Sequence, residues 1–385
     1  MPRRGRRRRR STRAEASRSS IVPVVSTDSR DSATGAPALA DAGLRVVVIG
    51  AGAVGSFLGG TLASAGMDVT LLARRPWDGP GDPGQLVLEG PDGGRATVSV
   101  CRILDPDAVP PPDLIVAAVK IFDLADALAT AARWPAVPLL TVQNGIGAEA
   151  EAAAARSSAI LAGSLTTAVE PIPGGARRRR TGGIGIAVAR GDAMAHALAA
   201  SLVDAWTSAG LPGLLCPDAE AMKWSKLLGN LVGNATSAIL DMDPGQIYAD
   251  PRTYSIERRQ VHEAVAVMRA MGHRPITLPG ANVTLLLRGL ALPEILGRPI
   301  VSRSIAGARG GKSPSLRLHV RGGDTGPTEA RWLNGAVADA GARNGVPTPV
   351  NAFLAAVTDE VAADPERAAW FAGRPDRLAD ALAAR

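Results

Sequence analysis

Three glycines within six residues, placed directly after a short apolar segment, constrain this chain more than any other feature of its sequence. The segment Arg45–Ile49 reads RVVVI, and Gly50, Gly52 and Gly55 follow it at the spacing G-x-G-x-x-G. A β-branched run of this length favours a strand, and residues 53–65 continue with the periodicity of a helix. In that frame the first glycine permits a tight turn, the second lets the backbone approach a pyrophosphate, and the third lets the helix pack on the strand. The sequence therefore predicts a dinucleotide-binding unit.

The helix after this turn would present its backbone N–H groups to the phosphates, because helix N-termini attract anions. We therefore expect the whole turn to contact the cofactor: Gly50, Ala51, Gly52, Ala53, Val54 and Gly55. The next expected strand, residues 69–72, runs into Ala73-Arg74-Arg75 without an acidic residue. An acid there would bind the ribose 2′-OH of NAD, whereas arginine accommodates the 2′-phosphate of NADP. The sequence favours NADP; the alternative interpretation is that both arginines form a solvated strand end.

From residue 44 onward, short β-branched runs alternate with Ala-rich helical stretches, which is typical of βαβ units around a parallel sheet. The expected strands are residues 45–49, 69–72, 114–119, 138–142, 159–165 and 184–189. Residues 86–88 and 97–100 flank a Gly-rich turn and predict a hairpin. Beyond residue 217 the expected elements are helices at 219–240, 253–272, 278–296, 328–343 and 350–363. The stretch 303–327, rich in Gly, Arg and Ser, is expected to be irregular and to lie at a domain junction.

These patterns predict an α/β plus all-α fold, in which an N-terminal Rossmann-like doubly wound sheet is followed by a helical C-terminal domain. We expect an NADP-binding domain over 44–217 and an all-helical substrate and catalytic domain over 218–385. Residues 1–43 carry ten arginines against four acidic residues, which is +6 of the net charge of +7. Like-charge blocks are typical of disordered tails, so we expect a disordered Arg-rich extension or a translation start placed too far upstream. The near-neutral remainder gives no reason to expect a nucleic-acid partner.

The sequence also argues against membranes, disulfides and metals. No run of about 18 apolar residues suggests a membrane span, and no apolar stretch follows the N-terminal arginines as in a secretory signal. Cys101 and Cys216 lie far apart and outside any CxxC motif, and the four histidines have no ligand spacing. We therefore expect a cytoplasmic protein without a metal site. The oligomeric state cannot be predicted from these patterns, although an all-helical second domain often supplies a homodimer contact.

One helical segment, residues 223–237, carries a polar stripe suited to catalysis. At about 100° per residue, Asn230 lies about 40° from Lys226, Asn234 about 80° and Ser237 about 20°. Asn is a poor helix former, so this stripe differs from the usual solvated face of Glu, Lys, Arg and Gln. A lysine flanked by amides can bind a carboxylate and protonate an alkoxide as a hydride reaches the carbon. The alternative interpretation is a helix face turned to water.

Three further residues stand where ligands or helix dipoles are found. Lys120 ends the expected strand 114–119, and Asn144 follows 138–142 in an Asn-Gly pair, while ligands in open α/β sheets bind beyond the carboxyl ends of strands. Lys120 could instead mark the exit of a strand to solvent, and Asn144 could be an ordinary turn residue. For Glu329 the residues alone favour a position in the first turn of a helix, where the helix dipole stabilises its charge.

Together these motifs resemble those of the ketopantoate reductase family, in order, over residues 44–365. The resemblance implies NADPH-dependent reduction of 2-dehydropantoate, a small 2-oxo acid, in pantothenate and coenzyme A biosynthesis. It implies Lys226 as the general acid. It implies cofactor contacts at Arg74, which would bind the 2′-phosphate, and at Lys120, Asn144, Val169 and Glu329. It implies substrate contacts at Asn144, Lys226, Asn230, Asn234 and Ser315, with Ser313 as an alternative to Ser315.

The chain departs from the family pattern in three respects. The Gly-rich stretch between Ser315 and Glu329 is about two residues longer than is usual in the family. Arg331 stands where an acid is common, and Pro244 stands near where some members have an asparagine. Because specificity follows small pocket contacts, a related NADP-dependent reductase of another 2-oxo acid is the alternative function. A third interpretation is a protein that binds NADP without turnover for redox sensing or nucleic-acid contact. The intact set of catalytic and substrate residues disfavours it.

Overall fold

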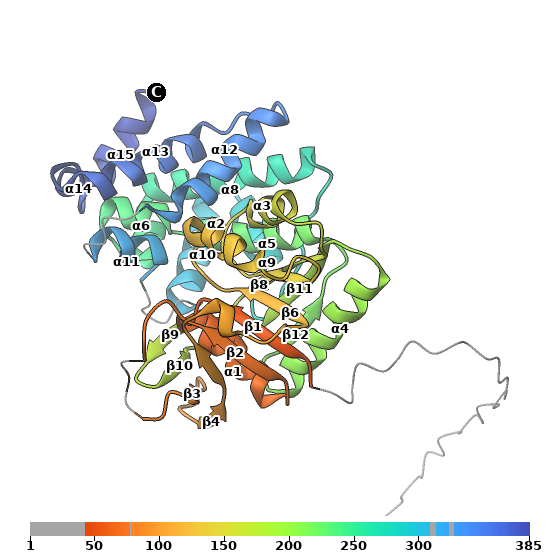
Figure 1. Ribbon diagram of the computed structural model, residues 1–385. Coiled ribbons are helices and arrows are strands. Elements are labelled where there is room, and N and C mark those ends of the chain that lie inside the picture. The colour runs from red at the N-terminus through yellow and green to blue at the C-terminus, as the bar shows by residue number, and fades with distance from the viewer. Residues whose placement is uncertain (1–42, 78, 80, 309–312, 323–326) are drawn as a thin grey trace, which may run out of the picture. The chain divides into compact units, whose positions relative to one another are not determined.

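The strand expected before the glycine turn, β1 (Arg45–Ile49), lies inside an eight-stranded sheet (Figure 1). The structure is a computed structural model that describes residues 43–385 except 78, 80, 309–312 and 323–326, so the expected extension 1–43 lies outside it apart from Gly43. The strands follow the spatial order β12 (Gly213–Leu215), β11 (Ile184–Arg190), β8 (Ile160–Leu165), β7 (Leu139–Thr141), β6 (Leu114–Ala117), β1, β2 (Asp68–Leu72) and β5 (Cys101–Ile103). β1 pairs in parallel with β2 on one side and β6 on the other, which makes its carboxyl end the topological switch point.

All six strands expected for this sheet are present, within two residues of their expected ends. One of them runs in an unexpected direction, because β11 is antiparallel to β8 and the sheet is therefore mixed. The sequence does not predict the edge strands β5 and β12, because three residues carry too little periodicity to be recognised.

Helices cover both faces of this sheet: α1 (Ala53–Ser64) and α4 (Ala193–Ser208) on one, α2 (Leu124–Ala131) and α3 (Ala148–Ala155) on the other. In β1, Val46 and Val48 belong to the apolar cluster shared with α1 and α4, whereas Val47 and Ile49 belong to the cluster shared with α2 and α3. Burial on both faces explains why this strand is apolar at consecutive positions. Two 3₁₀ turns, η1 (Pro106–Ala108) and η2 (Ile121–Asp123), lie in the connections.

The predicted hairpin is confirmed, and it forms part of a second, four-stranded sheet. Its strands are, in spatial order, β4 (Arg95–Ser99), β3 (Gln85–Glu89), β10 (Gly175–Arg178) and β9 (Val169–Ile172). This sheet packs on the side of α1 that faces away from the main sheet. A Cβ on Gly60 would lie 2.7 Å from Leu86 of the hairpin, and one on Gly59 would lie 2.9 Å from Leu71 of β2. Adjacent glycines thus let α1 fit between two sheets.

The remainder of the chain, from residue 219, is helical in its described residues apart from one isolated bridge. Its elements are α5 (Ala219–Leu231), α6 (Ala235–Leu240), α7 (Pro244–Ala249), α8 (Pro251–Ala270), α9 (Val283–Ala291), α10 (Glu294–Ala308), α11 (Ser315–Arg321), η3 (Glu329–Trp332), α12 (Asn334–Arg343), α13 (Pro349–Ala363), α14 (Pro365–Phe371) and α15 (Pro375–Ala383). The helices enclose their own apolar core, and α5 also packs on β8 and β11. The predicted fold class is therefore confirmed, while the domain boundary at 217/218 stays a prediction.

The predicted helix 219–240 is wrong at residues 232–234, where the chain breaks between α5 and α6. Gly233 has a φ of +55°, in the left-handed region, and its N–H donates to the Glu257 carboxylate at 2.7 Å. Glu257 lies in α8, is fully buried, and also accepts hydrogen bonds from Thr236 and Tyr248. A buried carboxylate from a distant helix therefore ends α5, and the ideal angles expected for residues beyond the break do not apply.

Three other predictions for this part of the chain, two of helices and one of an irregular stretch, are wrong in part. The helix expected over 278–296 begins only at Val283 and is interrupted at Leu292–Pro293, because the residue before a proline disfavours helical backbone. The helix expected over 328–343 begins as the separate turn η3 before α12. The stretch 303–327, expected to be irregular, contains the end of α10 and all of α11.

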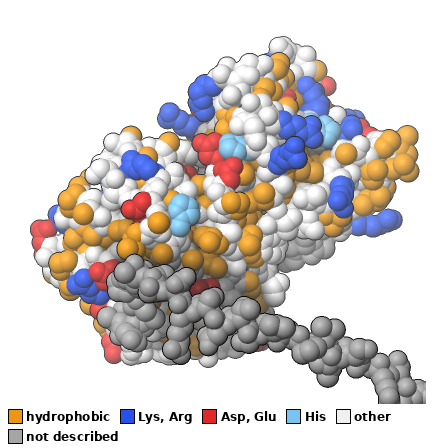
Figure 2. All heavy atoms as spheres, turned by 90° about the vertical axis from the view of Figure 1, so that its right-hand side faces the viewer, with side chains coloured by type: hydrophobic (Ala, Val, Ile, Leu, Met, Phe, Trp, Pro, Cys, Tyr) orange, Lys and Arg blue, Asp and Glu red, His pale blue; other side chains and the backbone are white. Residues whose placement is uncertain are grey.

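None of the helices in the described residues is long and apolar enough to cross a membrane. The face shown in Figure 2 carries Lys and Arg side chains at several separate places, with acidic side chains among them. The expectation that nucleic acid is not a partner stays a prediction.

Candidate active site

The turn after β1 has the geometry that its glycines predict. Gly50 has a φ of +105°, and its N–H donates to the carbonyl of Leu72 in β2 at 3.1 Å. A Cβ on Gly55 would lie only 1.9 Å from the carbonyl oxygen of Gly50, so a side chain there would push α1 away from the turn. Gly52 is the N-cap of α1 and a Cβ on it would meet nothing within 4 Å. The start of α1 has no side-chain cap and no acidic residue, which leaves it suited to an anion.

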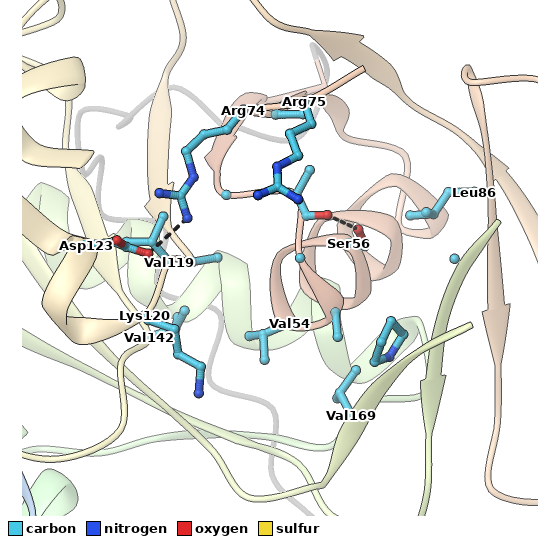
Figure 3. Close-up of a pocket in the computed structure, with 18 of the residues that line it drawn as sticks. Val54, Ser56, Arg74, Arg75, Leu86, Val119, Lys120, Asp123, Val142 and Val169 are labelled. Carbon is cyan, nitrogen blue, oxygen red and sulfur yellow. Dashed lines mark hydrogen bonds and ion pairs between the residues drawn. The ribbon is translucent and has the colours of Figure 1, made fainter. Parts of the chain in front are cut away.

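A cavity of about 900 Å³ opens over this turn, at the carboxyl ends of β1, β2, β6 and β7 (Figure 3). Among the cofactor contacts expected from the sequence, those that line it are Gly50, Ala51, Gly52, Ala53, Val54, Arg74, Lys120, Asn144, Val169 and Glu329. Gly55, which was also expected to contact the cofactor, does not line the cavity. Its missing side chain instead lets α1 approach the turn. The structure thus brings together residues that are up to 279 positions apart, from Gly50 to Glu329.

The arginines expected to read the 2′-phosphate lie at one side of this cavity. Figure 3 shows Arg74 pointing toward Asp123 of η2, and their side chains form an ion pair at 3.0 Å. Arg102 of β5 also lines the cavity and stacks over the ring of Trp77, with 4.4 Å from its Cζ to the ring centroid. Burial lowers the pKa of Arg102, and no ion pair with a described carboxylate offsets this effect. Sequence reasoning missed Asp123 and Arg102, because only the sheet order places η2 and β5 beside the end of β2.

Lys120 and Glu329 meet at the other side of the cavity. The Lys120 ammonium lies 3.5 Å from the Glu329 carboxylate, whose side chain is buried. Thr328 caps η3 by accepting a hydrogen bond from Ala330 N–H, so Glu329 does lie in the first turn of a helical element, as the residues alone favoured. The position in the cavity and the position in a first turn are therefore both observed, and the role of Glu329 in cofactor binding stays a prediction.

The Asn144 loop, between β7 and α3, is shaped by its contact with η3. Gly145 has a φ of +85°, and a Cβ there would lie 2.4 Å from the carbonyl oxygen of Trp332. The same carbonyl accepts a hydrogen bond from Ile146 N–H at 3.0 Å. The Asn-Gly pair is thus a turn, but one held against a distant segment with Asn144 lining the cavity. The turn and the ligand-site interpretations of Asn144 are compatible.

The helix α5 meets this loop with the face that carries Lys226. Asn230 Nδ2 lies 3.4 Å from Asn144 Oδ1. Lys226 precedes Asn230 by one helical turn, lies on the same face, and is half-buried. Neither residue lines the cavity itself, whereas Asn144 does. The structure therefore brings the helix that carries the expected proton donor into contact with the Asn144 loop, which lines the cavity.

Asn234 and Ser315 come together through a contact that the sequence did not predict. Asn234 is buried at the start of α6, and its Oδ1 accepts a hydrogen bond from Leu316 N–H at 3.2 Å. Ser315, the residue before Leu316, is exposed at the start of α11, and Ser313 is half-buried. Ser237, which an unbroken helix would align most closely with Lys226 in angle around its axis, is fully buried in α6 and leaves the stripe.

The start of α5 is fixed by a histidine that lies three residues beyond the end of α8. The Asp218 carboxylate caps α5 by accepting a hydrogen bond from Ala221 N–H at 3.0 Å, and it also contacts His273 Nδ1 at 2.9 Å. His273 Nε2 lies 2.8 Å from the Glu220 carboxylate. Burial disfavours the imidazolium, but its hydrogen bonds and the charges of both carboxylates outweigh this, so the pKa of His273 is raised. In the described residues, no group of three or more His, Cys, Asp or Glu side chains could hold a metal ion.

A glycine turn at the switch point of a Rossmann-like sheet, with a lysine and amides on a neighbouring helix, defines a class of dinucleotide-binding oxidoreductases. Two family models match this chain: Ketopantoate reductase PanE/ApbA over residues 46–188, and Ketopantoate reductase PanE/ApbA C terminal over residues 218–362. The chain belongs to the ketopantoate reductase family.

Individual relatives agree with this assignment. The 2-dehydropantoate 2-reductase of Halobacterium salinarum is 28% identical over 316 residues, which cover 81% of this chain and 97% of that protein. The crystal structure of a PanE/ApbA family ketopantoate reductase from Ralstonia eutropha JMP134 has a TM-score of 0.65 at 26% identity, covering 84% of this chain and 99% of that one. The ternary structure of D-mandelate dehydrogenase with NADH and anilino(oxo)acetate has a TM-score of 0.64 at 20% identity, covering 88% and 100%. This last likeness shows the shared fold.

Proposed function

We propose that this protein catalyses the NADPH-dependent reduction of 2-dehydropantoate to pantoate, a step in pantothenate and coenzyme A biosynthesis. One observation carries the proposal: the Asn144 loop lines the dinucleotide-type cavity and also contacts Asn230, one turn from Lys226. A site for a redox cofactor and a candidate proton donor thus adjoin the same loop. The family to which the chain belongs supports the reaction class. We place the reaction in the cytoplasm, and homodimer formation stays a prediction.

The residues around the cavity fit a nicotinamide dinucleotide phosphate. Gly52 leaves open space at the uncapped start of α1, where a pyrophosphate would bind. Arg74 and Arg75 line the cavity beside the end of β2 and suit the 2′-phosphate. Lys120, Asn144, Val169 and Glu329 would surround the other end. The bound reduced cofactor would supply the hydride.

The chain's own residues would then hold the oxo acid and move the proton. Reduction of a ketone develops negative charge on its oxygen, so the Lys226 ammonium stabilises the transition state and donates the proton to that oxygen. Asn230 and Asn144 orient the oxo group beside Lys226. Asn234 and Ser315, which the start of α11 brings together, bind the carboxylate end of the substrate.

Oxidation of NADPH by the purified protein, with 2-dehydropantoate and a panel of 2-oxo acids, tests the proposal. We expect 2-dehydropantoate to give the highest kcat/KM. The alternative, another 2-oxo acid, draws support from the D-mandelate dehydrogenase structure, which holds an oxo acid in the same fold. A different substrate at the top of the panel would favour that alternative, and no turnover with any of them would refute the reductase proposal.

Two variants test the residue assignments. Lys226→Ala should lower kcat by roughly 10² to 10⁴-fold and leave NADPH affinity nearly unchanged, as for the loss of a positioned acid. Arg74→Ala should weaken NADPH more than NADH, measured by titrating the quenching of protein fluorescence. Near-normal turnover of Lys226→Ala would remove this lysine from the mechanism, and equal weakening of both cofactors would remove Arg74 from recognition of the 2′-phosphate.

A further inference from the structure

A second lysine on α5, Lys223, is buried at the contact between this helix and the Asn144 loop. Its side chain is 5% exposed, and its Nζ lies 3.0 Å from the Glu149 carboxylate in the first turn of α3. The same Nζ donates to the backbone carbonyl of Gln143 at 2.7 Å. The desolvation of a buried ammonium is unfavourable and has to be offset by ion pairing and hydrogen bonds. Both partners come from the loop that lines the cavity or from the turn directly after it.

The partners of Lys223 are themselves anchored. The Glu149 carboxylate accepts a hydrogen bond from the Thr141 hydroxyl of β7 at 2.7 Å. The Gln143 side chain donates through Nε2 to the carbonyls of Ala117, at the end of β6, and Val119, at 2.8 and 3.2 Å. The ammonium therefore connects α5 to the ends of two strands at which the cavity opens.

Lys223 and Asn230 hold the loop from two points on one face of α5. They are seven residues apart, so they lie about 20° apart around the helix and about 10 Å apart along it. Lys226 lies between them along the helix axis but to one side of both around it, about 60° from Lys223 and about 40° from Asn230. The two contacts thus bracket the expected proton donor and set its distance from the Asn144 loop.

We infer that Lys223 is a positioning residue for the reductase reaction: its ammonium fixes the Gln143 peptide and the start of α3 against α5, which sets the separation between Asn144 and Lys226. This inference rests on the proposed function. Lys223 does not donate the proton, because its Nζ is buried and its hydrogen bonds are directed into the loop. Misplacing reacting groups by about 1 Å can cost about 10²-fold in rate, so this separation is important for turnover.

Lys223→Met, which keeps the length of the side chain and removes the charge, tests this inference. We expect kcat to fall about 10- to 100-fold, with the NADPH dissociation constant unchanged within about twofold. The primary isotope effect on kcat with 4-deuterated NADPH should increase, because hydride transfer becomes slower. Amide hydrogen exchange should become faster at residues 143–150 in the protein without substrate. This last readout does not depend on activity.

Arg156→Met is the matched control. Arg156 is also a buried cation that donates to backbone carbonyls, those of Ala131, Trp134 and Val137, but it does not line the cavity. It should lose a comparable amount of stability while keeping kcat and the isotope effect of the wild type. A similar fall of kcat in both variants would show that Lys223 acts through stability alone and would overturn the inference.

Three further measurements complete the test. Lys223→Arg should restore most of the lost kcat, and Glu149→Gln should reproduce part of the loss if Lys223→Met does not fold. The pH profile of kcat should keep its shape in Lys223→Met, because Lys226 still donates the proton.

Normal kcat and normal amide exchange at residues 143–150 in Lys223→Met would overturn the inference, as would the loss of one limb of its pH profile. If the wild type reduces no 2-oxo acid, the proposed function fails, and the hydrogen-exchange result still decides whether Lys223 holds the loop.

Discussion

Glu257 is the residue whose replacement best tests how the site is built, because it joins the break after α5 to the helix core. It is fully buried, and one carboxylate oxygen accepts hydrogen bonds from Gly233 N–H and the Tyr248 hydroxyl, both at 2.7 Å. The other oxygen accepts one from the Thr236 hydroxyl at 2.6 Å. In Glu257→Gln an amide NH2 group replaces one carboxylate oxygen, so at least one of the three hydrogen-bond donors then faces another donor. Leaving a buried partner of a charged hydrogen bond unsatisfied costs about 2 to 4 kcal/mol of unfolding free energy.

The same change should also affect the substrate site. Without the carboxylate, the left-handed turn at Gly233 is held less firmly, and Asn234 should lose its fixed contact with Leu316. We expect a higher KM for the oxo acid and an unchanged NADPH dissociation constant. Urea unfolding gives the free energy and steady-state kinetics gives KM, with the exposed Glu366→Gln as control. A variant within about 0.5 kcal/mol of the wild type, with a normal KM, would refute this account of the helix break.

Three shorter predictions concern the neighbourhood of the site. The folded-state pKa of His273 is raised, so its stabilising contribution should be complete below about pH 6.5 and should be lost as the pH rises through the raised value. The difference in unfolding free energy between the wild type and His273→Gln should therefore shrink at alkaline pH. Asp123→Asn should strengthen NADPH binding by at most about fivefold and leave NADH unchanged in titrations, because it frees Arg74 from an exposed pair of the kind worth up to about 1 kcal/mol. Gly145→Ala should lower both the melting temperature and kcat/KM, since its Cβ would clash with the Trp332 carbonyl; a variant with normal values for both would show that the loop tolerates displacement.

The sequence was sufficient where structure follows from neighbouring residues. The RVVVI run and the glycines at 50, 52 and 55 predict a strand, a turn and a helix, because each requirement for backbone conformation or close packing is met within a few positions. The hairpin around the Gly-rich turn and the change from strands to helices after residue 217 were predictable for the same reason. Lys120 and Asn144 were predicted because they follow strand ends, and Val169 because the resemblance to the family named it, whereas Arg102 and Asp123 in the same cavity were missed.

Tertiary structure decided the features that depend on partners far away in the sequence. The sequence pattern was interpreted as one helix through residues 232–234, and the Glu257 carboxylate that accepts the Gly233 N–H at the break comes from 24 positions further along the chain. Lys223 and Lys226 look alike in sequence, but packing of α5 on the Asn144 loop buries the first and leaves the second half-exposed. Asp123 became the partner of Arg74 because β6 and β2 flank β1 in the sheet. Sequence determines such pairs only through the complete fold, because burial and charge pairing depend on which segments meet in space.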